Sequence, residues 1–127
     1  MKVPGLTIRE LADRQVLVLA IEGEIPRDML DLALEAALGA IRRCTRYVVA
    51  ELSRAERISS TLAGLLGYYS KHFPTQGMQL LGVRGPARIM ALLAVAGADR
   101  VIPFFDTLDQ ALEHVGLAQP SGSSEAI

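Results

Sequence analysis

The sequence predicts an α/β domain with a mixed sheet, in the order β-β-α-β-α-β-α-β-α. Short β-like runs alternate with stretches in which apolar residues recur at spacings of three and four, as on one helix face. The first two β-like runs, 7–11 and 15–21, are separated only by Ala-Asp-Arg, as in a hairpin. Both faces of the second run are apolar, which is typical of a strand covered on two sides.

The middle of the chain predicts two helices and a strand between them. Gly23 ends the second strand, and Pro26 suits the first turn of the helix that follows. The apolar stripe of that helix consists of Leu30, Ala33, Leu34, Ala37, Leu38 and Ile41. A strand is expected over 47–52. The next helix has a stripe made of Leu62, Leu65, Leu66, Tyr69 and Phe73.

The last part predicts two further strands and two further helices. A strand over 78–83 leads to a helix that opens at Pro86 and closes at Gly97. The run 101–104 reads as a last strand, and the proline within it indicates an edge or a strand end. Thr107, with a glutamine three residues later, forms a capping box for a final helix that stops at Gly116.

Length and composition indicate one domain with an aliphatic core. The chain has 127 residues, half of them apolar, with three Tyr, three Phe and no Trp. We expect the domain to occupy 1–117 and residues 118–127 to form a flexible tail, because their composition shifts to Pro, Ser, Gly and Gln.

Charge and cysteine content favour a cytoplasmic protein that binds no nucleic acid. The net charge is −1, and acidic and basic residues are interspersed, so no basic field is expected. No segment approaches the roughly 18 to 20 apolar residues of a membrane span, and the N-terminus does not resemble a secretory signal. The lone Cys44 forms no internal disulfide and is expected to be a small buried apolar residue.

Five local sequences, in this order, resemble the STAS family, the sulfate-transporter and anti-sigma-factor-antagonist domain. They are VLVLAIEGEI over 16–25, YVVAELS over 47–53, MQLLGVRGPAR over 78–88, AGADRVIPF over 96–104 and TLDQAL over 107–112. Together they cover nearly everything from Val16 to Val115. The resemblance implies the STAS fold, with its initial antiparallel hairpin.

The antagonist branch of that family carries an Asp-Ser-Ser/Thr-Gly motif at the start of the second helix, where the partner kinase phosphorylates the first Ser. Aligned on Ile58, this chain places Ser60 at the phosphorylated position, with Ser59 and Thr61 as alternative acceptors. Ser59 stands where the family has Asp, and Leu62 where it commonly has Gly. Ser59 is still suited to cap the helix. From the residues alone, the same hydroxyls also read as an ordinary polar helix start.

The resemblance implies a regulatory protein-binding module without a cofactor, whose partner is a GHKL-type anti-sigma kinase or another signalling protein. A non-phosphorylated scaffold subunit, for example in a lipid-transport ABC system, and a small-ligand or lipid carrier are the alternatives. The expected partner surface surrounds the helix start. It comprises Arg54, Arg57, Ser59, Ser60, Thr61, Ala63, Gly64, Gly67, Tyr68 and Lys71.

The sequence offers no enzymatic or metal site. The hydroxyl of Ser60 is not in a G-x-S-x-G elbow, and His72 would lie about 18 Å further along the same helix. No His, Cys or carboxylate pair has metal-ligand spacing. The segment 90–96 is apolar all round, which indicates either tolerated surface alanines or a contact face for a partner or a second copy.

Overall fold

A β-hairpin opens the fold, as the sequence predicted. In the computed structural model, which describes residues 3–43 and 46–116, β1 (Leu6–Leu11) pairs antiparallel with β2 (Val16–Gly23). Of the four residues that connect the strands, the first three, Ala12, Asp13 and Arg14, have positive φ, between 53° and 67°. This left-handed backbone turns the chain back within a short span, so that Leu11 lies opposite Val16.

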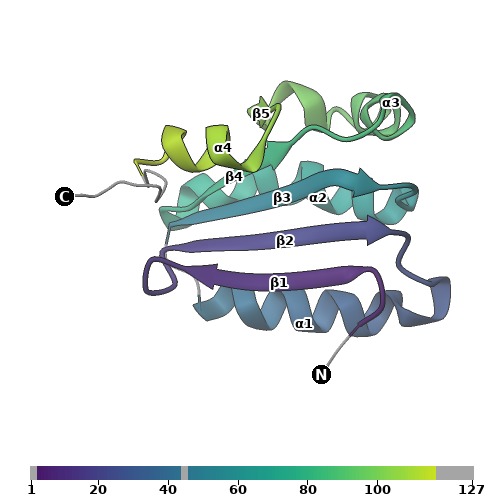
Figure 1. Cartoon of the computed structure of the whole chain (residues 1–127), viewed down its shortest axis with the longest axis horizontal. Coiled ribbons are helices and arrows are strands. Elements are labelled where there is room, and N and C mark those ends of the chain that lie inside the picture. Colours follow the sequence, from purple (N-terminus) through teal and green to yellow (C-terminus); the bar gives the residue numbers. More distant parts are fainter. Residues whose placement is uncertain (1–2, 44–45, 117–127) are drawn as a thin grey trace.

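Strands and helices then alternate (Figure 1). The elements are η1 (Arg27–Met29), α1 (Leu30–Arg43), β3 (Tyr47–Ala55), α2 (Ser60–His72), η2 (Phe73–Gln76), β4 (Gln79–Val83), α3 (Ala87–Val95), η3 (Ala98–Arg100), β5 (Phe104–Phe105) and α4 (Leu108–His114). The sheet has the order β1-β2-β3-β4-β5, and β2 to β5 are parallel. Because successive right-handed crossovers advance in one direction, their helices lie on one face of the sheet.

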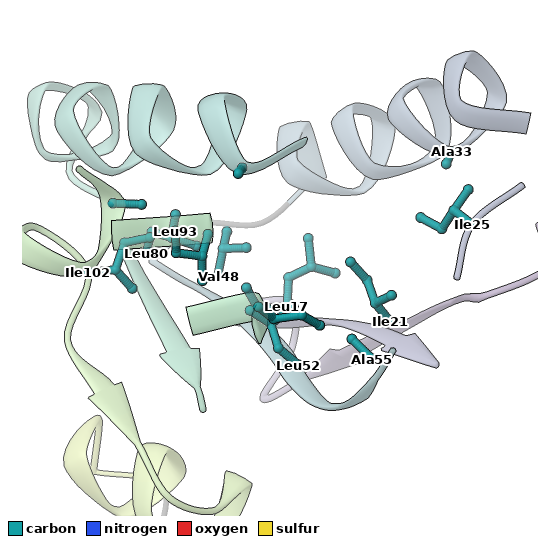
Figure 2. Close-up of a cluster of buried hydrophobic side chains, with 14 of the residues drawn as sticks. Leu17, Ile21, Ile25, Ala33, Val48, Leu52, Ala55, Leu80, Leu93 and Ile102 are labelled. Atoms are coloured by element: carbon teal, nitrogen blue, oxygen red, sulfur yellow. The ribbon is translucent and has the colours of Figure 1, made fainter. Parts of the chain in front are cut away.

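Alternate residues of the central strands supply two separate apolar layers. Leu17 and Val48 belong to a large cluster with residues of α1, α2 and α3, and the labelled members of this cluster appear in Figure 2. Val16 and Val18 belong to a smaller cluster with Ala111 of α4. Leu17 is fully buried, and Val16 and Val18 are 1% exposed. The prediction that β2 is covered on both sides is therefore confirmed.

The last strand is shorter than predicted and lies further along the chain. Only Phe104 and Phe105 pair with β4. Ile102 lies outside the strand because its backbone N–H donates to the Ala98 carbonyl as η3 ends, at 3.0 Å. Pro103 has no N–H to donate, but its carbonyl accepts a 2.9 Å hydrogen bond from Gly82.

The predicted cap is present at the start of α4, but the return hydrogen bond of the capping box has a different donor from the one expected. The Thr107 hydroxyl accepts from the Gln110 N–H at 3.1 Å. The Gln110 side chain, in turn, accepts from the N–H of Asp106 rather than from that of the cap residue. Cys44 and the predicted domain end at 117, with the tail 118–127, lie outside the described residues. Within the described ranges, no helix is long and apolar enough to cross a membrane.

Candidate functional site

The turn between β3 and α2 is tied to the end of β2. The backbone N–H groups of Glu56 and Arg57 both donate to the Gly23 carbonyl, at 2.7 and 3.3 Å. Ile58, the next residue, is half-buried against the large apolar cluster. These contacts fix the beginning of α2 at the carboxyl edge of the parallel strands.

Ser59 is the N-cap of α2. Its backbone is extended (φ −78°, ψ 157°), and its hydroxyl accepts a 3.0 Å hydrogen bond from the Leu62 N–H. Its carbonyl accepts the first helical bond, from Ala63, also at 3.0 Å. The capping role predicted for Ser59 is therefore confirmed. The serine takes the cap position that the family motif gives to an aspartate, and the hydroxyl is already in use.

Ser60 is the first residue of α2, and its side chain is exposed. Among the described residues its hydroxyl forms no hydrogen bond, in contrast to that of Ser59. Thr61 is also exposed. The first N–H groups of a helix lack intrahelical partners, and the helix dipole places partial positive charge there. A phosphate on Ser60 would therefore meet a favourable field without disturbing the cap.

Three further residues of the expected partner surface lie on the exposed face of α2, in line with Ser60. Gly64 and Lys71 are exposed, and Tyr68 is 53% exposed. The Tyr68 ring packs on that of His72, with centroids 4.1 Å apart. Successive members of this row are three or four residues apart, so they follow one side of the helix. Of the side chains in this row, Tyr68 is of a type that is enriched in protein interfaces.

The two arginines expected at this surface differ in their surroundings. Arg54 belongs to β3 and pairs with Glu22 at 3.8 Å, and both side chains are largely exposed. Arg57 lies in the turn before α2, is exposed, and forms no ion pair among the described residues. Arg57 is therefore the more available cation beside the helix start.

Two residues of the expected partner surface were wrongly assigned. Ala63 is 1% exposed, and Gly67 is buried. A Cβ on Gly67 would lie 3.5 Å from the Ala96 carbonyl oxygen and 3.8 Å from the Ala98 Cβ. These small residues face inward because α2 packs closely against the end of α3 and η3. They belong to the packing of the domain and not to its surface.

The predicted apolar stripe of α2 packs against the large cluster, but of its five members only Phe73 is deeply buried. Leu62, Leu65 and Leu66 are only half-buried, whereas Ser70, outside the stripe, is 8% exposed. The Ser70 hydroxyl satisfies its donor by bonding to the Gly67 carbonyl at 2.6 Å. The leucines face the space between α2 and α1, where they line two small apolar hollows.

A hollow of about 420 Å³ lies at the carboxyl ends of the strands, beside the start of α2. Three arginines line it, Arg27, Arg57 and Arg88, which come from three different connections. Arg27 and Arg88 are not among the site residues predicted from the sequence. Nothing in their local sequence marks them, but ligands of parallel α/β sheets bind at the carboxyl ends of the strands, and this rule could have found them.

The described residues include both histidines of the chain. Ser60 and His72 stand at opposite ends of α2, so the imidazole cannot serve the hydroxyl as a base. His114 is exposed at the end of α4, where its ring packs near that of Phe105, with centroids 5.0 Å apart. Among the described residues, no group of three or more His, Cys, Asp and Glu is placed to hold a metal ion.

The apolar segment 90–96 does present an exposed face. Ala91, Ala94 and Ala96 are exposed, and Val95 is 86% exposed. Leu93, in contrast, is fully buried and holds α3 to the large cluster. The outer side of α3 is therefore apolar and open to contact.

The fold is that of a small α/β domain with a five-stranded mixed sheet. A family model described as the STAS domain matches residues 9–111. This chain belongs to the STAS domain family. The mixed sheet, the antiparallel first hairpin and the four helices agree with that fold.

Solved structures with the same fold include several described as anti-sigma factor antagonists. The unphosphorylated form of SpoIIAA matches with a TM-score of 0.74 at 13% identity, over 87% of this chain and 96% of that one. A putative anti-sigma factor antagonist from Thermotoga maritima matches with a TM-score of 0.74 at 20% identity, over 87% and 94%.

An anti-sigma factor antagonist from Mycobacterium paratuberculosis shares more of the sequence. It is 31% identical to this chain, with a TM-score of 0.62, over 87% of this chain and 94% of that one. SpoIIAA from Bacillus also matches in its phosphorylated form, with a TM-score of 0.66 at 15% identity. No curated protein matches the sequence.

Proposed function

We propose that this chain is a cytoplasmic regulatory module that binds an anti-sigma factor, and that phosphorylation of Ser60 releases the partner. The proposal rests on the different roles of two neighbouring serines at the start of α2. Ser59 caps the helix through its hydroxyl, while Ser60 beside it presents an exposed hydroxyl with no partner among the described residues. Structures of SpoIIAA in both unphosphorylated and phosphorylated forms share the fold.

The physical basis of the switch is charge at an interface. A phosphoserine adds about −1.5 to −2 charges at pH 7. At the N-terminus of α2 this charge suits the domain itself, because the helix dipole favours an anion. Against a docked partner the same charge has to be buried or opposed, which weakens the complex. A tenfold loss of affinity corresponds to about 1.4 kcal/mol.

The proposed partner surface consists of Ser60, Thr61, Gly64, Tyr68 and Lys71 on α2, with the exposed Arg54 and Arg57 beside it. Gly64 has no atom within 4 Å of the position of a Cβ, so another backbone can approach closely. We propose a GHKL-type serine kinase as the partner, because such a protein both binds this surface and supplies the phosphate.

The test compares three variants of Ser60. Ser60→Asp places a charge at the site and is expected to weaken partner binding about tenfold or more. Ser60→Asn introduces a side chain of nearly the same shape as Asp but without its charge. This variant is expected to bind within about threefold of the wild type. Ser60→Ala should also bind, and it should abolish the mass increase of one phosphoryl group on incubation with the kinase and ATP.

The readout is the affinity of each purified variant for a GHKL-type kinase from the same organism, with intact mass and site mapping for the modification. Equal affinity of the Asp and Asn variants would exclude a charge switch. A phosphate found on Ser59 or Thr61 instead would move the switch to that residue, and no phosphate on any of the three would end the proposal.

A second candidate function is a constitutive scaffold subunit of a larger assembly. The exposed apolar side of α3, where Val95 is 86% exposed, favours it because such a face suits a permanent contact. This function predicts that Val95→Asp abolishes assembly while Ser60→Asp leaves it intact. The switch predicts the reverse order of effects.

A further inference from the structure

An apolar groove runs between α1 and α2 and opens into the arginine-lined hollow. We call it the α1–α2 groove. Its floor comes from β2 and β3, and its walls come from facing sides of the two helices. The lining residues beyond the mouth are apolar except for Tyr69, and they include Leu19, Ala50, Leu34, Ala37, Leu62 and Leu66. Figure 2 shows α1 and α2 lying over the same side of the sheet.

The three hollows adjoin one another, because neighbouring ones share lining residues. The mouth and the middle section share Ile21, Ile25, Leu30 and Leu62. The middle and far sections share Leu19, Leu34, Ala37, Ala50, Leu62 and Leu66. The mouth encloses about 420 Å³, and the deeper sections narrow to about 60 and 70 Å³.

The helices that form the groove expose more apolar surface than their sequences would lead one to expect. The fully buried residues of α1 are two alanines, Ala33 and Ala40, while its leucines stay half-buried. On α2 the same holds, because Ala63 and Gly67 turn inward and the leucines face α1. Two apolar helix sides therefore face each other across an unfilled space, which favours an apolar occupant.

The mouth of the groove carries a net positive charge. Arg27, Arg57 and Arg88 line it, and Glu24 is the acidic residue among them. None of the three arginines forms an ion pair among the described residues, whereas Arg54 is paired with Glu22. Unpaired guanidinium groups beside an apolar channel suit a ligand with an anionic head and an apolar body.

We propose that the α1–α2 groove binds a monomeric long-chain fatty acid, with its carboxylate at the arginines and its chain along the groove. A guanidinium matches a carboxylate with two parallel hydrogen bonds. The narrow deep sections suit an unbranched chain better than a ring. From Leu62 to Phe73, which line the groove, α2 rises about 16 Å, a length comparable with an extended long acyl chain.

The proposal does not depend on phosphorylation of Ser60. The two sites are neighbours, however, because the cap residue Ser59 and the leucine it binds, Leu62, both line the mouth. The fatty acid would lie on the side of α2 that faces the groove, whereas Ser60, Gly64, Tyr68 and Lys71 lie on its exposed side. A single protein can therefore be tested for each property separately.

The experiment titrates the full chain with dodecanoate, below its micelle concentration, by isothermal calorimetry. Dodecyltrimethylammonium, which has the same chain and a cationic head, is the matched ligand control. We expect one dodecanoate per chain and at least about tenfold weaker binding of the cation. Bound dodecanoate should also raise the melting temperature, because the unfolded chain lacks the groove.

Variants locate the two ends of the ligand. Arg57→Gln and Arg88→Gln are each expected to weaken dodecanoate binding about tenfold, because each removes a charged hydrogen-bonding group. Arg100→Gln, at an exposed arginine outside both the groove and the proposed partner surface, is the matched control and should leave dodecanoate binding unchanged. Ala37→Phe places a ring in the narrow sections and should weaken binding by a similar factor, with folding checked by circular dichroism.

Three results would overturn the proposal. The first is equal affinity for the two head groups. The second is wild-type affinity in both the Arg57→Gln and the Arg88→Gln variant. This result would be decisive even if Ala37→Phe fails to fold. The third is binding to vesicles of anionic phospholipid with none to monomeric dodecanoate, which would indicate a membrane-surface contact instead.

Discussion

The two glycines of α2 provide a direct test of which side of this helix faces inward. Gly64 and Gly67 are three residues apart in the same helix, and we consider Ala and Leu at each. At Gly64 no atom lies within 4 Å of the Cβ position. At Gly67 the Cβ position lies 3.5 Å from the Ala96 carbonyl oxygen, which is ordinary contact for a methyl group and leaves no room beyond it.

These distances set opposite signs for the larger side chain. Alanine fits at both positions and should stabilise the protein by about 0.5 to 1 kcal/mol, because glycine is the costlier residue within a helix. Leucine at Gly64 should stabilise to a similar extent. Leucine at Gly67 drives its extra carbons into Ala96 and Ala98, an overpacking that costs about 1 to 3 kcal/mol.

The assay is urea denaturation of the four variants, with the midpoint and the slope fitted separately. A shift of the midpoint at constant slope reports stability alone. Equal stability of Gly67→Leu and Gly64→Leu would refute our reasoning. The inward assignment of Ala63 and Gly67 would then be wrong, and the leucine stripe would be the buried face after all.

Two other predictions test the depth of the core and the helix cap. Leu17→Ala, at a fully buried position, should lower the free energy of unfolding by about 2 to 5 kcal/mol, as measured by chemical denaturation. Leu66→Ala, at a half-buried position, should cost about 1 to 2 kcal/mol, and equal costs would contradict an open groove. Ser59→Ala should cost about 1 kcal/mol through loss of the cap, whereas Ser60→Ala should cost less than about 0.5 kcal/mol.

The sequence predicts the order of elements because each one has its own local signal. The apolar residues on both faces of β2 require cover on both sides, and the structure provides it. The last strand lacks such a signal. It consists of the two residues after Pro103, Phe104 and Phe105, which form a strand only by pairing with β4. Its position depends on the tertiary partner Gly82, which local pattern does not specify.

The candidate site was predictable where it depends on chain-local chemistry. Ser59 and Ser60 follow a strand and precede an apolar stripe, so their place at a helix start can be read from the sequence. The facing of α2 was not predictable in this way. Periodicity favours the side with the most leucine, yet α2 packs at Gly67 against the end of α3 and the start of η3, where only a small residue fits. Arg27 and Arg88 are far apart in sequence and meet only when the strands align.

The close packing of α2 has a consequence for how a modification of this domain can affect its partners. Its start is bonded through Glu56 and Arg57 to Gly23, and its middle meets the α3 terminus nearly backbone to backbone at Gly67. A helix held at both places has little freedom to tilt or slide. A modification of its first turn would therefore leave the position of the helix unchanged. Its effect would fall on the free energy with which another molecule binds there.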